Sequence, residues 1–462
     1  MRQQGSCTLP ADESGRVLER LAGLSQVIPT ELQRQVFSDT GRVNVRACRL
    51  THEVMLWVVL AMGLFTDVPI RQVFKLSRRS REHERTPARS SLSEARQRLG
   101  VEPLRELHRR VVRPLATPQT PGALFHGLRP MALDGTILDA PDTPANREAF
   151  HRASGSRGEG GFPQVRKVSL VELSTHVEAA FAMGGWQNSE STLAASLLDR
   201  IPTDALLILD RGFFSFKLWK SLRKRNIAVL MRVKSQLVLQ PIKRLKDGSF
   251  IARIYPNGYD RSQDRNGIEV RLIEYTISDP ERPGYGEKHR LVTSLLDERE
   301  FPALEIVTFY HEQWEIELTF DEQKTHLDPI RASKPAQLRS ETPLGVEQEV
   351  LALSLAHFVI RALMFEAAQR QKIDPDRLSF TGCLHVLRAQ LPECPPGATE
   401  TQLRHWYDNL LWHLGQERTE PRRNRSNPRV VKRKMSRFGQ KRPKHRPRPK
   451  LTKTFAETIV IT

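Results

Sequence analysis

The sequence of 462 residues contains few cysteines, and none of them are closely spaced as in a CxxC motif. Its four cysteines, Cys7, Cys48, Cys383 and Cys394, show neither a CxxC motif nor the spacing of zinc ligands. This absence argues against a zinc-binding module. The thiols are typical of buried or incidental cysteines in a reducing compartment.

The N-terminal residues lack the apolar core of a secretory signal peptide. The most hydrophobic run, residues 54–65, is far shorter than the roughly 20 residues that span a bilayer, so we expect it to form a core helix. The sequence also contains no internal repeat. We therefore expect a cytoplasmic protein with no membrane partner.

Acidic residues are absent from residues 421–450, which carry fourteen Lys and Arg residues. The whole chain has 72 Lys and Arg against 53 Asp and Glu, a net charge of +19. Such an excess favours a polyanionic partner, because each neutralised phosphate releases a condensed counterion. Since this segment cannot bury enough apolar surface to fold alone, we expect it to be disordered without nucleic acid.

Changes of pattern along the chain predict several domains. An α/β part begins near residue 121 and contains the continuous apolar run 205–209, which is typical of a strand buried on both faces. Asn-Gly turns and alternating polarity then predict antiparallel strands. The predicted parts are a helical N-terminal domain, an α/β core, a β-rich insertion, the second part of the core, a C-terminal helical region and a basic tail: residues 1–120, 121–235, 236–300, 301–370, 371–420 and 421–462.

A short helix is predicted where Ser91 and Glu94 have capping-box spacing and Gly100 follows as a C-cap residue. It carries Arg96 and Arg98. A small basic helix of this kind suits a reader of a DNA groove. A solvated basic surface helix would have the same pattern, and the sequence leaves both interpretations open.

Two aspartates directly follow apolar strands, Asp134 in MALDG and Asp210 in LLILDRG. Functional side chains of α/β sheets gather beyond the carboxyl ends of strands, so both are candidates for chemistry. The alternative is a turn, because Asp-Gly is a common turn pair. Asp139 and Asp142 lie close enough in sequence to be rivals of Asp134.

A glutamate, Glu317, lies on a helix predicted over residues 304–327. At about 100° per residue, one apolar stripe of this helix should be buried: Phe309, Ile316, Phe320 and Leu327. A second stripe lies beside it: Tyr310, Gln313, Glu317 and Lys324. A carboxylate in that position is partly desolvated, as a metal ligand would be, although polar residues also border ordinary amphipathic helices.

In combination, the three carboxylates of Asp134, Asp210 and Glu317 can form an oxygen-ligand cage for Mg²⁺, with Mn²⁺ as a substitute. A pair of such ions activates an attacking oxygen and stabilises the leaving oxygen at a phosphodiester. In a basic chain, this set of side chains predicts metal-assisted displacement at the phosphodiesters of a nucleic acid.

The segment YHEQWEIELTFDEQKTHL, residues 310–327, resembles the helix motif of the bacterial insertion-sequence-4 family of DDE transposases. That motif is Tyr, two residues, Arg, three residues, Glu, six residues, Lys, and Tyr310, Glu317 and Lys324 match it. LDGTILD and LDRGFFSFKLW resemble the segments with the first and second catalytic aspartates of the family. The N-terminal and C-terminal parts also look like the family, so the resemblance covers nearly the whole chain.

The resemblance implies an α/β fold with a ribonuclease-H-like core, interrupted by a β-rich insertion and preceded by a helical DNA-end-binding domain. It implies metal-dependent cutting at transposon ends and attack of the freed 3′-hydroxyl on target DNA. The expected partners are double-stranded DNA, as terminal inverted repeats and target, and a second copy of the chain in the DNA complex. DNA contacts are expected from several residues: Tyr310, Gln313, Lys324, Arg211, Arg96 and Arg98.

The sequence departs from the family at Gln313, where the family has Arg. Arg offers a charged, bidentate contact to phosphate, whereas Gln offers only a neutral hydrogen bond. The alternative function is therefore a transposase-derived DNA-binding protein with weak or lost cutting activity. A structural RNA-binding protein would explain the basic tail, but the aromatic stacking motifs that it predicts are missing.

Overall fold

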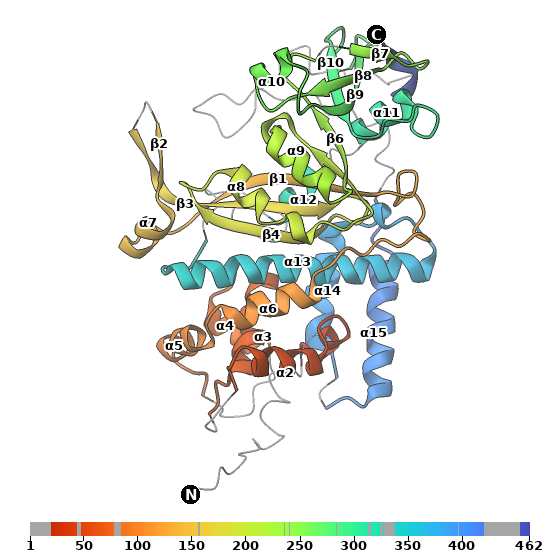
Figure 1. The fold of residues 1–462 in the computed structure, drawn as a ribbon. Helices are drawn as coiled ribbons and strands as arrows, with labels where there is room; N and C mark the ends of the chain where they lie inside the picture. The colour runs from red at the N-terminus through yellow and green to blue at the C-terminus, as the bar shows by residue number, and fades with distance from the viewer. Residues whose placement is uncertain are drawn as a thin grey trace, which may run out of the picture. The chain divides into compact units, whose positions relative to one another are not determined.

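A computed structural model of the chain describes most of its residues, and these ranges are the ones discussed below: 20–43, 48–77, 85–155, 158–234, 236–239, 241–282, 284–312, 316–323, 327, 338–395, 397–419 and 453–462. The chain divides into two compact units (Figure 1). The first consists of Met1–Ala123, Ala132–Arg200 and Glu315–Thr419. The second consists of Leu124–Met131, Ile201–Trp314 and Glu420–Thr462.

The first unit contains most of the helices. They are α2 (Thr30–Asp39), α3 (His52–Leu64), α4 (Ile70–Leu76), α5 (Arg89–Leu99), α6 (Glu102–Val111), α7 (Pro144–Phe150), α8 (Glu190–Ala195), α12 (Ile316–Asp321), α13 (Pro343–Gln371), α14 (Phe380–Gln390) and α15 (Glu400–Leu414). Helix α13 runs between the strand β4 (Val177–Gly185) and the helices α3 and α6 (Figure 1). It is therefore the central element of this unit.

Two apolar helices form the core of the first unit. Every residue of α3 from Val54 to Leu64 is buried, which confirms the prediction of a core helix there. Among the described helices, α13 alone is long and apolar enough to cross a membrane, and 89% of its apolar window is buried inside the unit. Packing therefore accounts for the apolar composition of α13. From the sequence, residues 54–65 were identified as the most hydrophobic run, and the longer apolar helix α13 was not.

The strands of the first unit form an antiparallel group. Strand β3 (Gly158–Glu172) pairs with β4 from Val165↔Gly185 to Glu172↔Val177 and also with β2 (Arg152–Gly155). Strand β1 (Arg129–Asp139) is the other neighbour of β3. It begins in the second unit and continues into the first.

The second unit is built on the parallel pair β5 (Ala205–Leu209) and β6 (Ala228–Arg232), connected through helix α9 (Phe216–Lys224). The remaining strands continue the order β6-β10-β9-β8-β7 with antiparallel pairs. Their bounds and those of the remaining helices are β7 (Pro241–Arg244), β8 (Phe250–Ile254), β9 (Ile268–Ile277), β10 (His289–Thr293), α10 (Gly258–Ser262) and α11 (Ala303–Glu312). The predicted β-rich segment is thus present, and it extends the sheet of β5 and β6 because β10 pairs with β6.

The last ten residues of the chain are ordered. Strand β11 (Ile459–Ile461) pairs antiparallel with β9, and the short helix η9 (Ala456–Thr458) precedes it. The C-terminal end of the region predicted as a basic tail, residues 421–462, is therefore structured, because a strand from elsewhere in the chain supplies backbone partners for this β-branched segment. Residues 420–452, which include the fourteen cations, lie outside the described residues.

Three local predictions need correction. Helix α5 begins at Arg89 with Ala88 as its N-cap, so Ser91 and Glu94 lie inside the helix and form no capping box. Gly100 does end this helix, with a φ of +73° that favours glycine. Strand β1 continues through Asp134 to Asp139, so the strand does not end at the first aspartate.

Candidate active site

Asp134 lies in the middle of β1 and is half-buried. The strand forms because Met131, Ala132 and Leu133 are buried in the core. The backbone N–H of Gly135 donates a hydrogen bond of 2.7 Å to Oδ1 of Asp134. Since both residues belong to a strand, the alternative of an Asp-Gly turn is wrong.

The glycine after Asp134 has a steric explanation. A Cβ atom at Gly135 would lie 2.7 Å from Oε1 of Glu190, so the carboxylate of that residue occupies the space. Successive side chains of a strand point to opposite faces, so Glu190 lies on the face away from the Asp134 side chain. The sequence pair Asp-Gly therefore reflects close packing behind the strand.

The two rivals of Asp134 have structural partners. The Asp142 carboxylate pairs with Arg147 at 2.7 Å and with Arg152 at 2.6 Å, and the hydrogen bond from Arg152 helps to hold its pKa below the usual range. Asp139 accepts a hydrogen bond of 3.2 Å from Nε2 of Gln164. These contacts hold the region around α7 in place, and they leave Asp134 as the better candidate for chemistry.

Asp210 directly follows the fully buried strand β5, as predicted. Its side chain is exposed, and its backbone oxygen accepts from the N–H of Phe213 in the short helix η3 (Arg211–Phe213). Within the described part of the chain, the Asp210 carboxylate has no recorded hydrogen bond or ion pair. Arg211, the next residue, is also exposed.

Tyr310 lies near Asp210 in the second unit. Burial raises the pKa of Tyr310 to about 12, and the negative charge of Asp210 contributes to this rise. The Tyr310 side chain is only 9% exposed. The resemblance implied a direct DNA contact by this residue, whereas the structure shows a buried side chain that the charge of the second aspartate influences.

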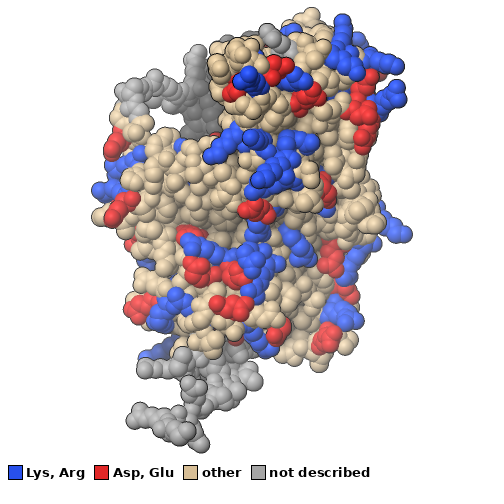
Figure 2. All heavy atoms as spheres, in the orientation of Figure 1, with Lys and Arg blue, Asp and Glu red and all other residues tan. Residues whose placement is uncertain are grey.

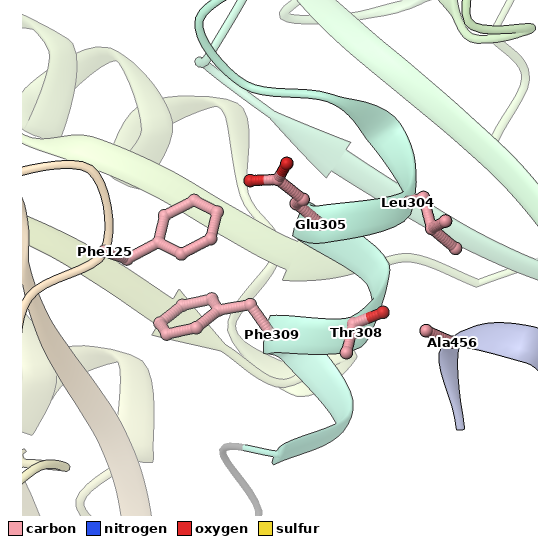
Figure 3. Close-up of a pocket in the computed structure, with 6 residues that line it drawn as sticks. All are labelled: Phe125, Leu304, Glu305, Thr308, Phe309 and Ala456. Carbon is pink, nitrogen blue, oxygen red and sulfur yellow. The ribbon is translucent and has the colours of Figure 1, made fainter. Parts of the chain in front are cut away.

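The exposed face of α11 differs from the predicted one. Phe309 is half-buried and stacks on Phe125, with ring centroids 4.2 Å apart, whereas Tyr310 is buried. The two rings lie next to each other beside α11 and line a pocket of about 320 Å³ in the second unit (Figure 3). The pocket is lined by Phe125, Leu304, Glu305, Thr308, Phe309 and Ala456. With one carboxylate among its lining residues, it is not a site for a metal cage.

Glu317 lies in the described backbone of α12, and its side chain lies outside the described part of the structure. The predicted DNA-contacting residues Gln313 and Lys324 are also outside it. Phe320 and Leu327 are buried, which confirms two members of the predicted apolar stripe. The expectation of one helix over residues 304–327 can be followed only in its described segments, α11 and α12.

Buried polar contacts anchor the chain around α12. The Glu322 carboxylate accepts a hydrogen bond of 3.0 Å from Nε2 of His357 and pairs with Arg361. Burial would raise the pKa of Glu322, but the charge of Arg361 and the hydrogen bond from His357 outweigh it and lower the pKa to about 2. Next to it, Oε1 of Gln323 accepts a hydrogen bond of 3.0 Å from Nζ of Lys167. These contacts fix the segment that carries Glu317.

The sequence analysis did not single out Glu322. A usable signal was present in the sequence, because His357 and Arg361 are four residues apart inside a long, mainly apolar segment. Two ionisable side chains on one face of a buried helix require a partner. Among the described side chains, no group of three His, Cys, Asp or Glu residues lies close enough together to hold a metal ion.

The DNA-binding prediction for Arg96 is corrected by its contacts. Its guanidinium donates to Oε1 of Gln348 at 2.8 Å, to the carbonyl of Gly345 at 2.6 Å and to Oγ of Ser340 at 3.1 Å. The side chain therefore joins α5 to the start of α13 and is not available to DNA. Arg98 on the same helix is exposed.

Comparison with known proteins decides the family. Residues 18–109 match the family "Insertion element 4 transposase N-terminal", and residues 126–358 match the family "Transposase DDE domain". The chain is 30% identical over 424 residues to transposase InsG for insertion sequence element IS4 of Escherichia coli, covering 89% of this chain and 92% of that protein.

The chain belongs to the insertion-sequence-4 family of DDE transposases. This transposase also resembles putative transposase InsZ of Escherichia coli, with 29% identity over 43% of this chain and 66% of that protein. A putative transposase for element IS4SA of Synechocystis is 23% identical over 44% of this chain and 54% of that protein. A solved piggyBac transposase synaptic complex aligns with a TM-score of 0.43 at 12% identity, covering 87% of each chain, which is too distant to support an argument.

Membership establishes the general activity of this transposase. It is a DNA-cleaving and strand-transferring enzyme of an insertion sequence. DDE domains of transposases use divalent metal ions in general, and DNA is the partner of the family.

Proposed function

We propose that this transposase cuts the ends of its element by metal-dependent hydrolysis of a phosphodiester and joins the freed 3′-hydroxyl to target DNA by transesterification. In the first step, water attacks phosphorus and the bond to the 3′-oxygen breaks. In the second, the 3′-hydroxyl attacks a phosphorus of the target and displaces another 3′-oxygen. The match to the DDE domain, whose residues 126–358 include all three carboxylates, is the observation that carries this proposal.

Asp134, Asp210 and Glu317 would hold the metal, as two Mg²⁺ ions with Mn²⁺ as a substitute. Carboxylate oxygens are the donors that these ions prefer. The exposed carboxylate of Asp210 and the half-buried one of Asp134 suit this role, because neither residue is fully buried. When bound, the ions would activate the attacking oxygen and stabilise the leaving one.

The finer assignments follow the family resemblance. The core around these carboxylates would be ribonuclease-H-like, and the enzyme would act as a homodimer on DNA in the cytoplasm, associated with the nucleoid. Residues 1–120 would recognise the terminal inverted repeats. Lys324, Gln313, Arg211 and Arg98 would contact the DNA backbone, and buried Tyr310 would position Asp210.

Substitution of the three carboxylates tests the proposal. Asp134→Asn, Asp210→Asn and Glu317→Gln should each lower end cleavage and joining at least 1,000-fold, roughly the loss expected when a metal ligand is removed, while end binding stays within about threefold. The substrate is DNA from the flanks of the gene, where short terminal inverted repeats are expected. Asp142→Asn is the matched control, because Asp142 pairs only with nearby arginines in the described structure.

Wild-type cleavage by Asp210→Asn would remove this residue from the site. The second candidate function, a DNA-binding protein with weak or lost cutting, is favoured by Gln313 alone. In the same assay, it predicts end binding by the natural sequence without cleavage in either Mg²⁺ or Mn²⁺.

A further inference from the structure

Helix α9 presents a row of lysines on its outer face. Lys217, Lys220 and Lys224 are spaced i, i+3 and i+7, so at about 100° per residue they fall within a sector of about 60°. All three are exposed. Trp219 and Leu222 are buried on the other side of the helix and fix its orientation in the second unit.

The surrounding segment strengthens this charge. Residues 211–226 contain six Lys and Arg residues and no Asp or Glu, and the segment starts directly after Asp210. Lys and Arg side chains gather over α9 on the surface shown in Figure 2. None of the three lysine side chains forms an ion pair or a hydrogen bond with another described residue.

Helix α6 shows the opposite arrangement within the first unit. Arg105 pairs with Glu102 and Glu347, and Arg109 and Arg110 both pair with Glu106. Each arginine of α6 is therefore neutralised inside the protein. Among the described residues the lysines of α9 have no such partner, which leaves their charge for an anion from outside.

We propose that the lysine row of α9, Lys217, Lys220 and Lys224, binds the phosphate backbone of the target DNA duplex. The row is about 10.5 Å long, at 1.5 Å per residue, and faces roughly six backbone charges at one per 1.7 Å of duplex. Lysine ammonium groups contact phosphates without reading bases. A surface indifferent to sequence suits target DNA better than the element ends, which the enzyme must recognise.

This inference rests on the proposed function, because the target duplex must approach the carboxylates that would join it to the element. Asp210 lies seven residues before Lys217, and the short helix η3 connects β5 to α9. The row thus flanks the second catalytic candidate within the same unit. An acidic protein would also neutralise lysines, and the experiment separates that outcome from DNA.

The test removes the row and keeps the fold. The variant combines Lys217→Ala, Lys220→Ala and Lys224→Ala, since alanine favours helix and the buried face is untouched. The matched control combines Arg253→Ala, Arg370→Ala and Arg404→Ala, which removes three positive charges that each pair with acidic residues of the protein and lie outside residues 1–120. Thermal unfolding of both proteins checks that they fold.

Two measurements are made on full-length proteins with Mg²⁺. The first is the ratio of strand transfer, from a pre-cleaved end into a plasmid, to cleavage of an uncut end. The second is the salt dependence of binding to a random duplex. The α9 variant should lose about tenfold in the ratio, and its salt slope should fall by about 2.7, at 0.9 for each lost phosphate contact. The control should stay within twofold of the wild type.

Equal ratios of transfer to cleavage for the α9 variant and the control would overturn the inference. An equal loss of cleavage and transfer would also overturn it, because the lysine row would then bind the element ends. An unchanged salt slope would also overturn it and favour an acidic protein as the partner. If the wild-type enzyme cut no DNA at all, the proposed function would fail, while the salt slope would still decide whether the row binds duplex phosphates.

Discussion

Helices α5 and α9 are both rich in cations, and they use them in different ways. Arg96 of α5 is held by Gln348, Ser340 and Gly345 in the first unit, whereas the lysines of α9 extend from the second unit without recorded partners among the described residues. From sequence, α5 was the candidate for DNA contact, and no such role was predicted for α9. The difference shows that a basic helix indicates nucleic-acid binding only when its charges lack partners in the fold.

The largest effect on this comparison should come from Arg96→Ala. Its loss leaves buried acceptors on Gln348 and Gly345 without a donor and removes a charge near buried Glu349, so unfolding free energy should fall by about 3 kcal/mol. Denaturation in urea measures this. Arg98→Ala, on the exposed side of the same helix, should change stability by less than about 0.5 kcal/mol. Full stability with lost end binding in Arg96→Ala would reverse the roles of the two helices.

Buried charges in the first unit should also make stability depend on pH. Burial lowers the pKa of His108 to about 4, and the charge of Lys167 helps to lower the pKa of Glu178 to about 2 against the opposing effect of burial. Both folded-state pKa values lie below the unfolded ones, so both contributions are present at neutral pH. The stability that His108 contributes is lost as pH falls from about 6.5 to 4. The stability that Glu178 contributes is lost as pH falls from about 4.5 to 2.

The corresponding measurement is the urea midpoint between pH 7 and pH 4. His108→Gln should remove part of the fall seen in the wild type, up to about 3 kcal/mol. The α9 lysine variant should follow the wild-type curve, because lysines do not titrate in this range. A wild-type midpoint that stayed flat from pH 7 to pH 4 would contradict the assignment of buried neutral His108.

The basic segment 421–450 offers a third set of cations for comparison. Replacing its fourteen Lys and Arg residues by Gln should flatten the salt dependence of binding and weaken binding to all DNA alike. Residues 453–462 must be kept, because β11 pairs with β9. Fluorescence anisotropy with end and scrambled duplexes should give an unchanged ratio of affinities. A collapse of that ratio would mean that the segment reads sequence.

The smallest effect should come from restoring the family residue with Gln313→Arg. A charged, bidentate contact to phosphate should improve end binding about fivefold, near 1 kcal/mol, with little change on scrambled DNA. Titration of both duplexes at one salt concentration measures it. Equal improvement on both would show a general charge effect, and no improvement would place residue 313 away from the DNA.

The sequence predicted the elements whose signals are local. The continuous apolar run of β5 was located to the residue, because a strand buried on both faces leaves no other pattern. Long-range packing decided the failures. Arg96 meets partners that lie 244 to 252 residues further along the chain, and β11 depends on pairing with β9. Neither contact leaves a local trace in the sequence.

The candidate site divides in the same way. Asp134 and Asp210 were predicted as site residues from their strands, and the structure places Asp134 within β1 and Asp210 directly after β5. The predicted buried face of α11 was wrong by one residue, since Phe309 is half-buried and Tyr310 is buried. The cause is a tertiary contact, the stacking of Phe309 on Phe125. A helical wheel gives the period of a helix but not the neighbour that will cover it.

The central claim is that three carboxylates far apart in sequence hold one metal site. Its most direct measurement replaces Mg²⁺ with Fe²⁺ in the complex with end DNA and maps where hydroxyl radicals formed at the iron cut the polypeptide. The account predicts fragments ending near Asp134, Asp210 and Glu317 together, suppressed by excess Mg²⁺ and lost in Asp210→Asn. Fragments confined to the region of Asp139 and Asp142, with none near residues 210 and 317, would contradict it.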